Sequence, residues 1–358
     1  NVANADLRTS SGDDTINASQ DLNNSSNSTL NSSDAIDGGA GTDRLNVNVQ
    51  NQGNSTSVAP QMSNVEQLFI RNTNDNTGDN NEFTFNANNV DGLEEVWSTV
   101  SSGGSETQVT SLENTDVTVG LRDTDEDFVA EFNDNAVDAN DDSVDVIAED
   151  GTNANLAIGG SVSESVEILN VTSRGGAANT IDINSGDATI GNQGVTTINV
   201  TGDQELSINN AGTASVRTID ASGGGGTDAL NGNLSVTLAA VDANTSGGIS
   251  LTGASGSDSL NFGNITGLNN ANAELTVVGG AGGDTFTAAN VLQSVDANAT
   301  ISIQGGDGED TLNVNNVGGN DPLGSNIAND AITNIETLSA NLQNGAVGNN
   351  LDATKIAN

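Results

Sequence analysis

A strict 26-residue repeat constrains the fold of this chain more than any other feature. The stretch ISIQGGDGEDTLNVNNV at 301–317 has two upstream copies, ISLTGASGSDSLNFGNI at 249–265 and LTVVGGAGGDTFTAANV at 275–291. Five columns keep the same step, including the aspartates and the apolar series Leu260, Phe286 and Leu312. Such constancy indicates one structural unit per repeat, each packed on the next.

Looser copies extend the repetition over most of the chain. IDASGGGGTDALNG at 219–232, IDGGAGTDRLNVNV at 36–49 and LRTSSGDDTINAS at 7–19 share the glycine-aspartate phrase. A second phrase, with an acidic residue after an apolar one, occurs as VEQLFI at 65–70, VEILNV at 166–171 and IETLSA at 335–340. Both phrases alternate apolar and polar residues, which is the pattern of strands, and glycine clusters mark the turns.

The pattern predicts an all-β fold, a parallel β-helix or β-solenoid with calcium-binding glycine-rich turns. We expect three segments: an N-terminal solenoid at 1–91, an acidic and less regular segment at 92–165, and a C-terminal solenoid at 166–358 that carries the 26-residue repeats. Small residues such as Ala288 and Val314 would fill the interior, and Asn264, Asn290 and Asn316 would stack as an amide ladder. A row of β-sandwiches is one alternative, and a sandwich-like insertion at 92–165 within the solenoid is another.

The charge of the chain excludes several classes of partner. Forty-nine acidic residues against seven basic ones give a formal net charge of −42. A chain of this charge repels nucleic acids and anionic membranes, and no apolar run is long enough to predict membrane insertion. Cysteine is absent, so neither disulfides nor thiolate metal sites can stabilise the fold. Screening by cations would relieve the self-repulsion.

The glycine-rich turns match the nonapeptide G-G-x-G-x-D-x-apolar-x, the calcium-binding turn of repeat-in-toxin proteins. Full matches occupy 38–46, 223–231, 279–287 and 305–313, whereas 253–261 lacks the second glycine. The candidate metal-binding residues are the aspartates and glycines of these turns: Asp43, Gly38, Gly39, Gly41, Asp228, Gly223, Gly226, Asp258, Gly253, Asp284, Gly279, Gly280, Gly282, Asp310, Gly305, Gly306, Asp307 and Gly308.

Calcium is the cofactor that this chemistry predicts. Glycines allow positive φ angles that turn carbonyls inward, and aspartate adds a hard anionic oxygen. The turn therefore offers an all-oxygen shell, which suits Ca²⁺ better than Mg²⁺. If the repeats stack, Asp258, Asp284 and Asp310 lie about one strand spacing apart, and each neighbouring pair repels by roughly 3 kcal/mol at an effective dielectric constant near 20. A cation between the coils would turn this repulsion into a net attraction between the coils. The alternative is that glycine and aspartate are simply good turn formers.

Catalysis finds little support in the sequence, and we expect no enzyme. Histidine, cysteine and tyrosine are absent, so only paired carboxylates could act. Trp97 and Phe69 could stack on sugar rings, but core positions are the simpler interpretation. The recurring glutamates of the second phrase are expected to face outward and solubilise the protein: Glu66, Glu95, Glu167 and Glu336.

The nonapeptides, the phrases TFNANNV (84–90) and VEQLFI, the single lysine and the lack of cysteine together resemble bacterial surface-layer proteins of the repeat-in-toxin type. The resemblance implies type I secretion, an extracellular location on the bacterial cell surface, calcium-triggered folding and self-assembly into a lattice or filament. It implies the protein itself as partner, with Ca²⁺ and cell-envelope polysaccharide as further ones. An adhesin stalk and, less in keeping with the residues, a polysaccharide-active β-helix enzyme are the alternative functions.

Overall fold

The computed structural model describes residues 6–51, 53–74, 82–104, 106–160, 164–183, 194–209, 216–223, 229–244, 247–316, 323–342 and 356–357. The contacts divide the chain into two compact units, 1–195 and 196–358. The border at Val195 and Thr196 lies inside the third of the segments expected from the sequence. Each unit is described by itself.

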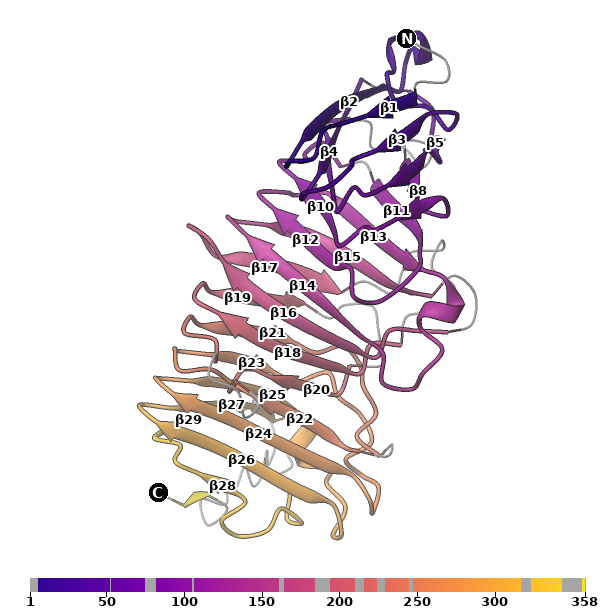
Figure 1. The fold of residues 1–358 in the computed structure, drawn as a ribbon. Coiled ribbons are helices and arrows are strands. Elements are labelled where there is room, and N and C mark those ends of the chain that lie inside the picture. The colour runs from indigo at the N-terminus through magenta and orange to yellow at the C-terminus, as the bar shows by residue number, and fades with distance from the viewer. Residues whose placement is uncertain are drawn as a thin grey trace. The chain divides into compact units, whose positions relative to one another are not determined.

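The N-terminal unit contains three parallel sheets, whose strands Figure 1 shows as stacked ladders. The first sheet consists, in order, of β2 (Thr15–Asp21), β4 (Arg44–Gln50), β7 (Gln67–Asn72), β10 (Glu95–Thr99), β12 (Thr118–Arg122), β14 (Ser143–Glu149) and β16 (Ile168–Arg174). The second consists of β5 (Thr56–Val58), β8 (Phe83–Asn86), β11 (Glu106–Leu112), β13 (Asp127–Phe132), β15 (Asn153–Gly160) and β17 (Asn179–Ile183). A short third sheet consists of β1 (Asp6–Arg8), β3 (Ala35–Asp37), β6 (Gln61–Ser63) and β9 (Val90–Asp91).

The C-terminal unit has two parallel sheets with alternating strands. One consists of β18 (Thr197–Gly202), β20 (Thr218–Asp220), β22 (Ile249–Thr252), β24 (Glu274–Ala281), β26 (Thr300–Asp307), β28 (Ile332–Thr333) and β30 (Ile356–Ala357). The other consists of β19 (Leu206–Asn209), β21 (Leu234–Thr237), β23 (Ser259–Asn261), β25 (Thr285–Ala289), β27 (Thr311–Asn316) and β29 (Thr337–Leu342). Three 3₁₀ turns are the helical segments in the described part of the chain: η1 (Ser25–Asn27), η2 (Asp134–Ala136) and η3 (Val291–Gln293).

This architecture confirms the predicted all-β solenoid. The chain passes from one sheet to the next and returns one strand further on, so every recorded strand pair is parallel. The strands within 92–165 continue these ladders, since β10 pairs with β7 and β12, and β13 pairs with β11 and β15. The described part of that segment is therefore solenoid and contains no sandwich.

Alternation along the strands builds the core. In β4 the residues Leu45, Val47 and Val49 are buried, and the polar residues between them are half-exposed. Leu45 pairs with Leu68, which pairs with Val96, so apolar residues of successive coils form a continuous inward column. Because successive side chains of a strand point to opposite faces, this period of two encloses a narrow apolar interior.

The 26-residue step is the register of the ladders β22–β24–β26 and β23–β25–β27–β29 in the C-terminal unit. Leu260 pairs with Phe286, and Phe286 pairs with Leu312, as the sequence columns predict. Ala288 and Val314 are buried, also as expected, but Val314 pairs with Ala289, because the register shifts after Thr287. The amide of Asn264 donates to the carbonyl of Leu238 in the preceding coil at 3.1 Å, and the side chain of Asn316 lies outside the described residues, so the amide ladder stays a prediction.

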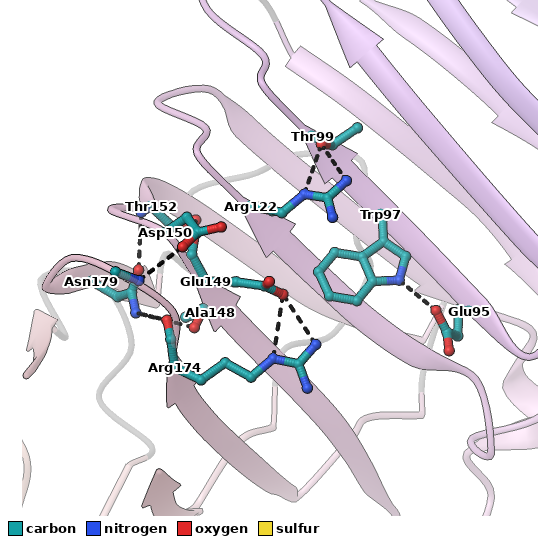
Figure 2. Close-up of polar contacts among 11 residues, drawn as sticks. Glu95, Trp97, Thr99, Arg122, Ala148, Glu149, Asp150, Thr152, Arg174 and Asn179 are labelled. Atoms are coloured by element: carbon teal, nitrogen blue, oxygen red, sulfur yellow. Dashed lines mark hydrogen bonds and ion pairs between the residues drawn. The ribbon is translucent and has the colours of Figure 1, made fainter. Parts of the chain in front are cut away.

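A buried polar corner joins the two larger sheets of the N-terminal unit. Figure 2 shows Asn179 accepting a hydrogen bond from the backbone N–H of Thr152, at 3.0 Å. The N–H of Gly151 donates to the same oxygen, also at 3.0 Å. The side-chain nitrogen of Asn179 donates to the carbonyls of Ala148 and Arg174, at 3.1 and 3.2 Å. The N–H groups of Gly151 and Thr152 lie at the corner between β14 and β15, where a side chain can supply the acceptor. Asn179 therefore fastens its own coil to the preceding one.

Candidate functional site

The aspartates of the 26-residue repeats lie one above another at the corner between the two sheets of the C-terminal unit. Asp258 follows the turn after β22, Asp284 the turn after β24, and Asp310 the turn after β26. All three are buried, with 2, 1 and 0% of their surface exposed. Carboxylates are seldom buried without partners, so the surroundings of each oxygen decide what the site can do.

One oxygen of each carboxylate is held by the backbone of the preceding coil. The Oδ1 atom of Asp284 accepts a hydrogen bond from the backbone N–H of Asp258 at 2.8 Å, and Oδ1 of Asp310 accepts one from Asp284 at 2.8 Å. At the start of the series, Oδ1 of Asp258 accepts from Leu234 at 2.7 Å. We call Asp258, Asp284, Asp310 and the residue that continues the series, Glu336, the acidic ladder.

Glu336 closes the ladder, and the sequence alone did not predict this role. Its Oε2 atom accepts a hydrogen bond from the backbone N–H of Asp310 at 2.7 Å, the position that an aspartate fills in the coils before it. Glu66 does the same for Asp43 at 2.6 Å, and Glu167 for Asp142 at 3.1 Å. Glu336 is exposed, as expected, and Glu66 and Glu167 are half-exposed, but each carboxylate also satisfies a backbone donor of the neighbouring coil.

The other oxygen is unpartnered at three of the aspartates. The Oδ2 atoms of Asp43, Asp284 and Asp310 are buried and have no hydrogen-bond donor. An unsatisfied buried carboxylate oxygen costs several kcal/mol unless a proton or a cation is present. These three atoms recur at the equivalent position of three turns, which makes them the candidate ligand atoms.

The turn glycines expose these oxygens to a carbonyl of the next coil. A Cβ on Gly279 would lie less than 3.0 Å from both Oδ2 of Asp284 and the carbonyl oxygen of Gly305, a separation that real Cβ atoms essentially never show. Gly305 stands in the same relation to Oδ2 of Asp310 and the carbonyl of Asn334. Glycine is thus required at the first position of the turn, and a carboxylate and a carbonyl oxygen converge beside it.

The turn of the N-terminal unit repeats this arrangement. Oδ1 of Asp43 accepts from the backbone N–H of Asp14 at 2.7 Å, and its Oδ2 lies, with the carbonyl of Asn64, beside Gly38. Asn64 and Asn334 have positive φ angles of 54° and 52°, which asparagine tolerates better than most residues. The residue directly before each of the phrases VEQLFI and IETLSA therefore supplies the carbonyl oxygen, and the glutamate of the phrase supplies the closing carboxylate.

Burial makes the charged ladder costly. Removal from water is the largest cause that raises the pKa of Asp284, to about 7, although the backbone bond from Asp258 opposes it and the charges of Asp258 and Asp310 add to it. Burial also raises the pKa of Asp258 to about 6, against two backbone hydrogen bonds. Burial is the largest cause that raises the pKa of Asp310. The backbone hydrogen bond from Asp284 lowers it, and the charge of Glu336 adds a smaller increase.

The donors of the ladder fit a hard cation. Among the described residues no group of three or more histidine, cysteine, aspartate or glutamate side chains could hold a metal ion, so a cation here would depend on backbone carbonyls as well as one carboxylate. That mixture suits Ca²⁺, which accepts six to eight oxygen ligands in irregular geometry. The unpartnered Oδ2 atoms and the glycine cradles are compatible with it.

The remaining predicted ligands differ in position. The side chain of Asp307 is exposed, apart from the buried carboxylates, and its carbonyl accepts from the backbone of Gly282 at 2.7 Å. Gly39, Gly41, Gly280, Gly282, Gly306 and Gly308 have positive φ angles. Gly223 also has a positive φ angle, of 86°, whereas Asp228 and Gly226 lie outside the described residues. The turn at Gly253 is distinct and is treated below.

The aromatic pair is not an open platform for sugars. Trp97 lies on the opposite strand face from the inward Val96, yet it is only 4% exposed. Its ring stacks on Phe69, with centroids 5.4 Å apart and planes at 11°, and the guanidinium of Arg122 lies 5.6 Å from it. Figure 2 shows the indole nitrogen donating to Glu95, at 2.8 Å. The pair is a sealed stack that stabilises this face.

In the described part of the chain, no helix is long and apolar enough to cross a membrane. Comparison of the chain with family models, with curated proteins and with solved structures gave no match.

Proposed function

We propose that this protein is a structural, extracellular protein of a bacterial cell surface that folds around Ca²⁺ and assembles with copies of itself into a surface layer or filament. The observation that carries the proposal is the set of three buried, unpartnered Oδ2 atoms, each facing a carbonyl of the next coil. The resemblance of the turns to calcium-binding nonapeptides supports the same conclusion.

The residues of the ladder have separable tasks in this proposal. The Oδ1 atoms of Asp284 and Asp310 orient the carboxylates through backbone hydrogen bonds. The Oδ2 atoms, with the carbonyls of Gly305 and Asn334, are the ligands. A bound Ca²⁺ supplies the positive charge that offsets the repulsion between stacked carboxylates. Without it, the carboxylates must take up protons or separate, so binding energy becomes folding energy.

The net charge links the same ion to assembly. Copies that each carry a formal charge of −42 repel one another, and divalent cations reduce that repulsion. A regular solenoid also offers repeated rows of side chains and strand edges to a neighbour. We therefore place folding and self-association under one control, the calcium concentration outside the cell.

Calcium titration of the full chain tests the proposal. After dialysis against a chelator, circular dichroism should show a partial loss of strand signal, and light scattering should show single chains that are less compact and still partly folded. Added Ca²⁺ should restore the strand signal first and then produce large particles, which electron microscopy should resolve as ordered sheets or filaments. Mg²⁺ at the same ionic strength should restore much less, because its rigid octahedral shell fits these oxygens poorly.

A triple variant with Asp43→Asn, Asp284→Asn and Asp310→Asn is the matched control. It keeps an acceptor for each backbone N–H but removes the anionic ligands, and it should fold without responding to Ca²⁺. Identical structure and assembly of the unmodified protein in excess chelator would refute the proposal. Sugar-dependent binding by a soluble monomer would favour an adhesin stalk instead, and depolymerisation of an acidic glycan would favour an enzyme.

A further inference from the structure

One of the four described nonapeptide turns is built differently from the others. The turns at Asp43, Asp284 and Asp310 have glycine at the second position, namely Gly39, Gly280 and Gly306. The turn at Asp258 has Ala254 there. The ladder bond of Asp258 is the same as in the other coils, since its Oδ1 accepts a backbone N–H at 2.7 Å. The second oxygen is where the turns diverge.

At Asp258 a backbone donor already occupies the second oxygen. The N–H of Ala254 donates to Oδ2 of Asp258 at 2.6 Å, so this carboxylate is fully satisfied by the protein. Ala254 keeps a negative φ, and so does Gly256 at the fourth position. The local backbone thus turns an N–H toward the carboxylate.

In the other three turns the second residue has a positive φ angle. Gly39, Gly280 and Gly306 have φ angles of 94°, 115° and 114°. No donor reaches Oδ2 of the corresponding aspartate, and that oxygen stays buried and unpartnered. An alanine is strained at such φ angles, by about 1–2 kcal/mol. A Cβ on Gly280 would also lie less than 3.0 Å from the carbonyl of Ala254.

We propose that the second residue of each turn decides whether its aspartate binds a cation: Asp43, Asp284 and Asp310 bind Ca²⁺, and Asp258 does not. At Asp258 the N–H of Ala254 takes the place of the ion. This inference rests on the proposed calcium-dependent folding, and it specifies which of the turns bind the ion.

The physical argument is one of competition for a single oxygen. The partial positive charge of the Ala254 N–H already stabilises the Asp258 carboxylate, and that hydrogen would repel a cation approaching the same atom. Binding there would require breaking a short charge-assisted hydrogen bond and inverting φ at an alanine. At Asp284 and Asp310 neither cost exists, and the ion gains an oxygen that has no other partner.

The Asp258 turn therefore needs no ion to keep its structure. It lies at one end of the ladder, and its backbone N–H is the donor for Asp284. A coil that stays ordered without calcium gives the following coils a fixed edge on which to pair. The substitution of alanine for glycine is thus a functional difference, and the turn is not a degenerate copy of the calcium turn.

Counting bound ions on the full chain tests this assignment. Calcium stoichiometry, measured by equilibrium dialysis with radioactive Ca²⁺, is compared among the unmodified protein and the Asp258→Asn, Asp284→Asn and Asp310→Asn variants. Asp258→Asn should leave the count unchanged, whereas Asp284→Asn and Asp310→Asn should each remove at least one ion. The three substitutions are matched in size and burial, but Asp258→Asn also turns an amide toward the Ala254 N–H, so the ion count of each variant is compared only after circular dichroism in saturating Ca²⁺ shows the strand signal of the unmodified protein.

A reciprocal pair sharpens the test. Ala254→Gly should add one ion, because glycine can adopt the positive φ that frees Oδ2, and adding Asp258→Asn to it should remove that ion again. A loss of one ion in Asp258→Asn alone, or no gain in Ala254→Gly, overturns the inference. Absence of saturable calcium binding by the unmodified protein is a different result, because it overturns the proposed function as well.

Discussion

Replacing Asp284 by asparagine should stabilise the calcium-free protein and destabilise the calcium-loaded one. Asparagine keeps an oxygen to accept the backbone N–H of Asp258, which the native Oδ1 accepts at 2.8 Å. Its amide nitrogen would take the place of Oδ2, which faces the carbonyl of Gly305. The variant therefore exchanges a buried, unpartnered anionic oxygen for a donor that points at an acceptor.

The magnitude follows from the pKa of Asp284. Burial and neighbouring charges raise the pKa from 3.8 to about 7. A shift of one pKa unit corresponds to about 1.4 kcal/mol, so holding this group ionised at neutral pH lowers the free energy of unfolding by at most about 4 kcal/mol. Solvent relaxation and bound counter-ions reduce the figure, and we expect a gain of about 2 kcal/mol for Asp284→Asn in chelator.

Two measurements check this prediction. Urea unfolding followed by circular dichroism in chelator should place the variant at the higher midpoint, and the order should reverse in saturating Ca²⁺. Hydrogen exchange with mass spectrometry of peptides from β24 to β27 should locate the change. Asp307→Asn is the matched control, because that side chain is exposed and should change neither condition by more than about 0.5 kcal/mol. Destabilisation by Asp284→Asn in chelator would show that the charge itself, and not its burial, stabilises the ladder.

The pH dependence, the glycines and the closing glutamate give further predictions. In chelator, the stabilisation from protonated Asp258 and Asp284 is complete below their unfolded pKa of 3.8 and is lost as pH rises through their folded pKa values of about 6 and 7. The urea midpoint should therefore be higher at pH 5 than at pH 8. A pH difference of equal size in Asp284→Asn would contradict this. Gly305→Ala should lower the free energy of unfolding by about 1–3 kcal/mol, because the added Cβ overlaps the carbonyl of Asn334. Gly12→Ala is the control: its Cβ would have no atom within 4 Å, and the free energy of unfolding should change by no more than about 0.5 kcal/mol. Glu336→Ala should lower the free energy of unfolding by about 1–2 kcal/mol, because it leaves the Asp310 N–H without its acceptor. Glu336→Gln should recover most of that loss when both variants are compared by thermal unfolding. Equal losses in the two variants would mean that the charge matters rather than the hydrogen bond.

The column of aspartates could be predicted because a constant step fixes the register. Asp258, Asp284 and Asp310 have to align once strands 26 residues apart pair in parallel, as Leu260 and Phe286 do. The same step, continued once more, leads from Asp310 to Glu336, and this was the signal that could have identified the closing residue. In the N-terminal unit the corresponding bond joins Glu66 to Asp43, 23 residues apart, so no constant step reveals it.

The state of the second oxygen could not be predicted, because it depends on a backbone angle. The sequence shows that Ala254 replaces a glycine, but not that its N–H then points at Asp258. Likewise, the pairing of Ala289 with Val314 follows from a bulge at Ala289, whose φ is 45°. Such local deviations shift a column by one residue while the alternation in the sequence stays the same.

The ladder bonds keep one geometry across separations of 29, 23 and 26 residues along the chain. Differences in coil length are therefore absorbed away from this corner, in the connecting segments that leave the stack unchanged. A protein built in this way can display peptides of different lengths at a regular vertical spacing. For an engineer, the connecting segments are the places to insert an epitope or an affinity tag, and the corner is the part to leave untouched.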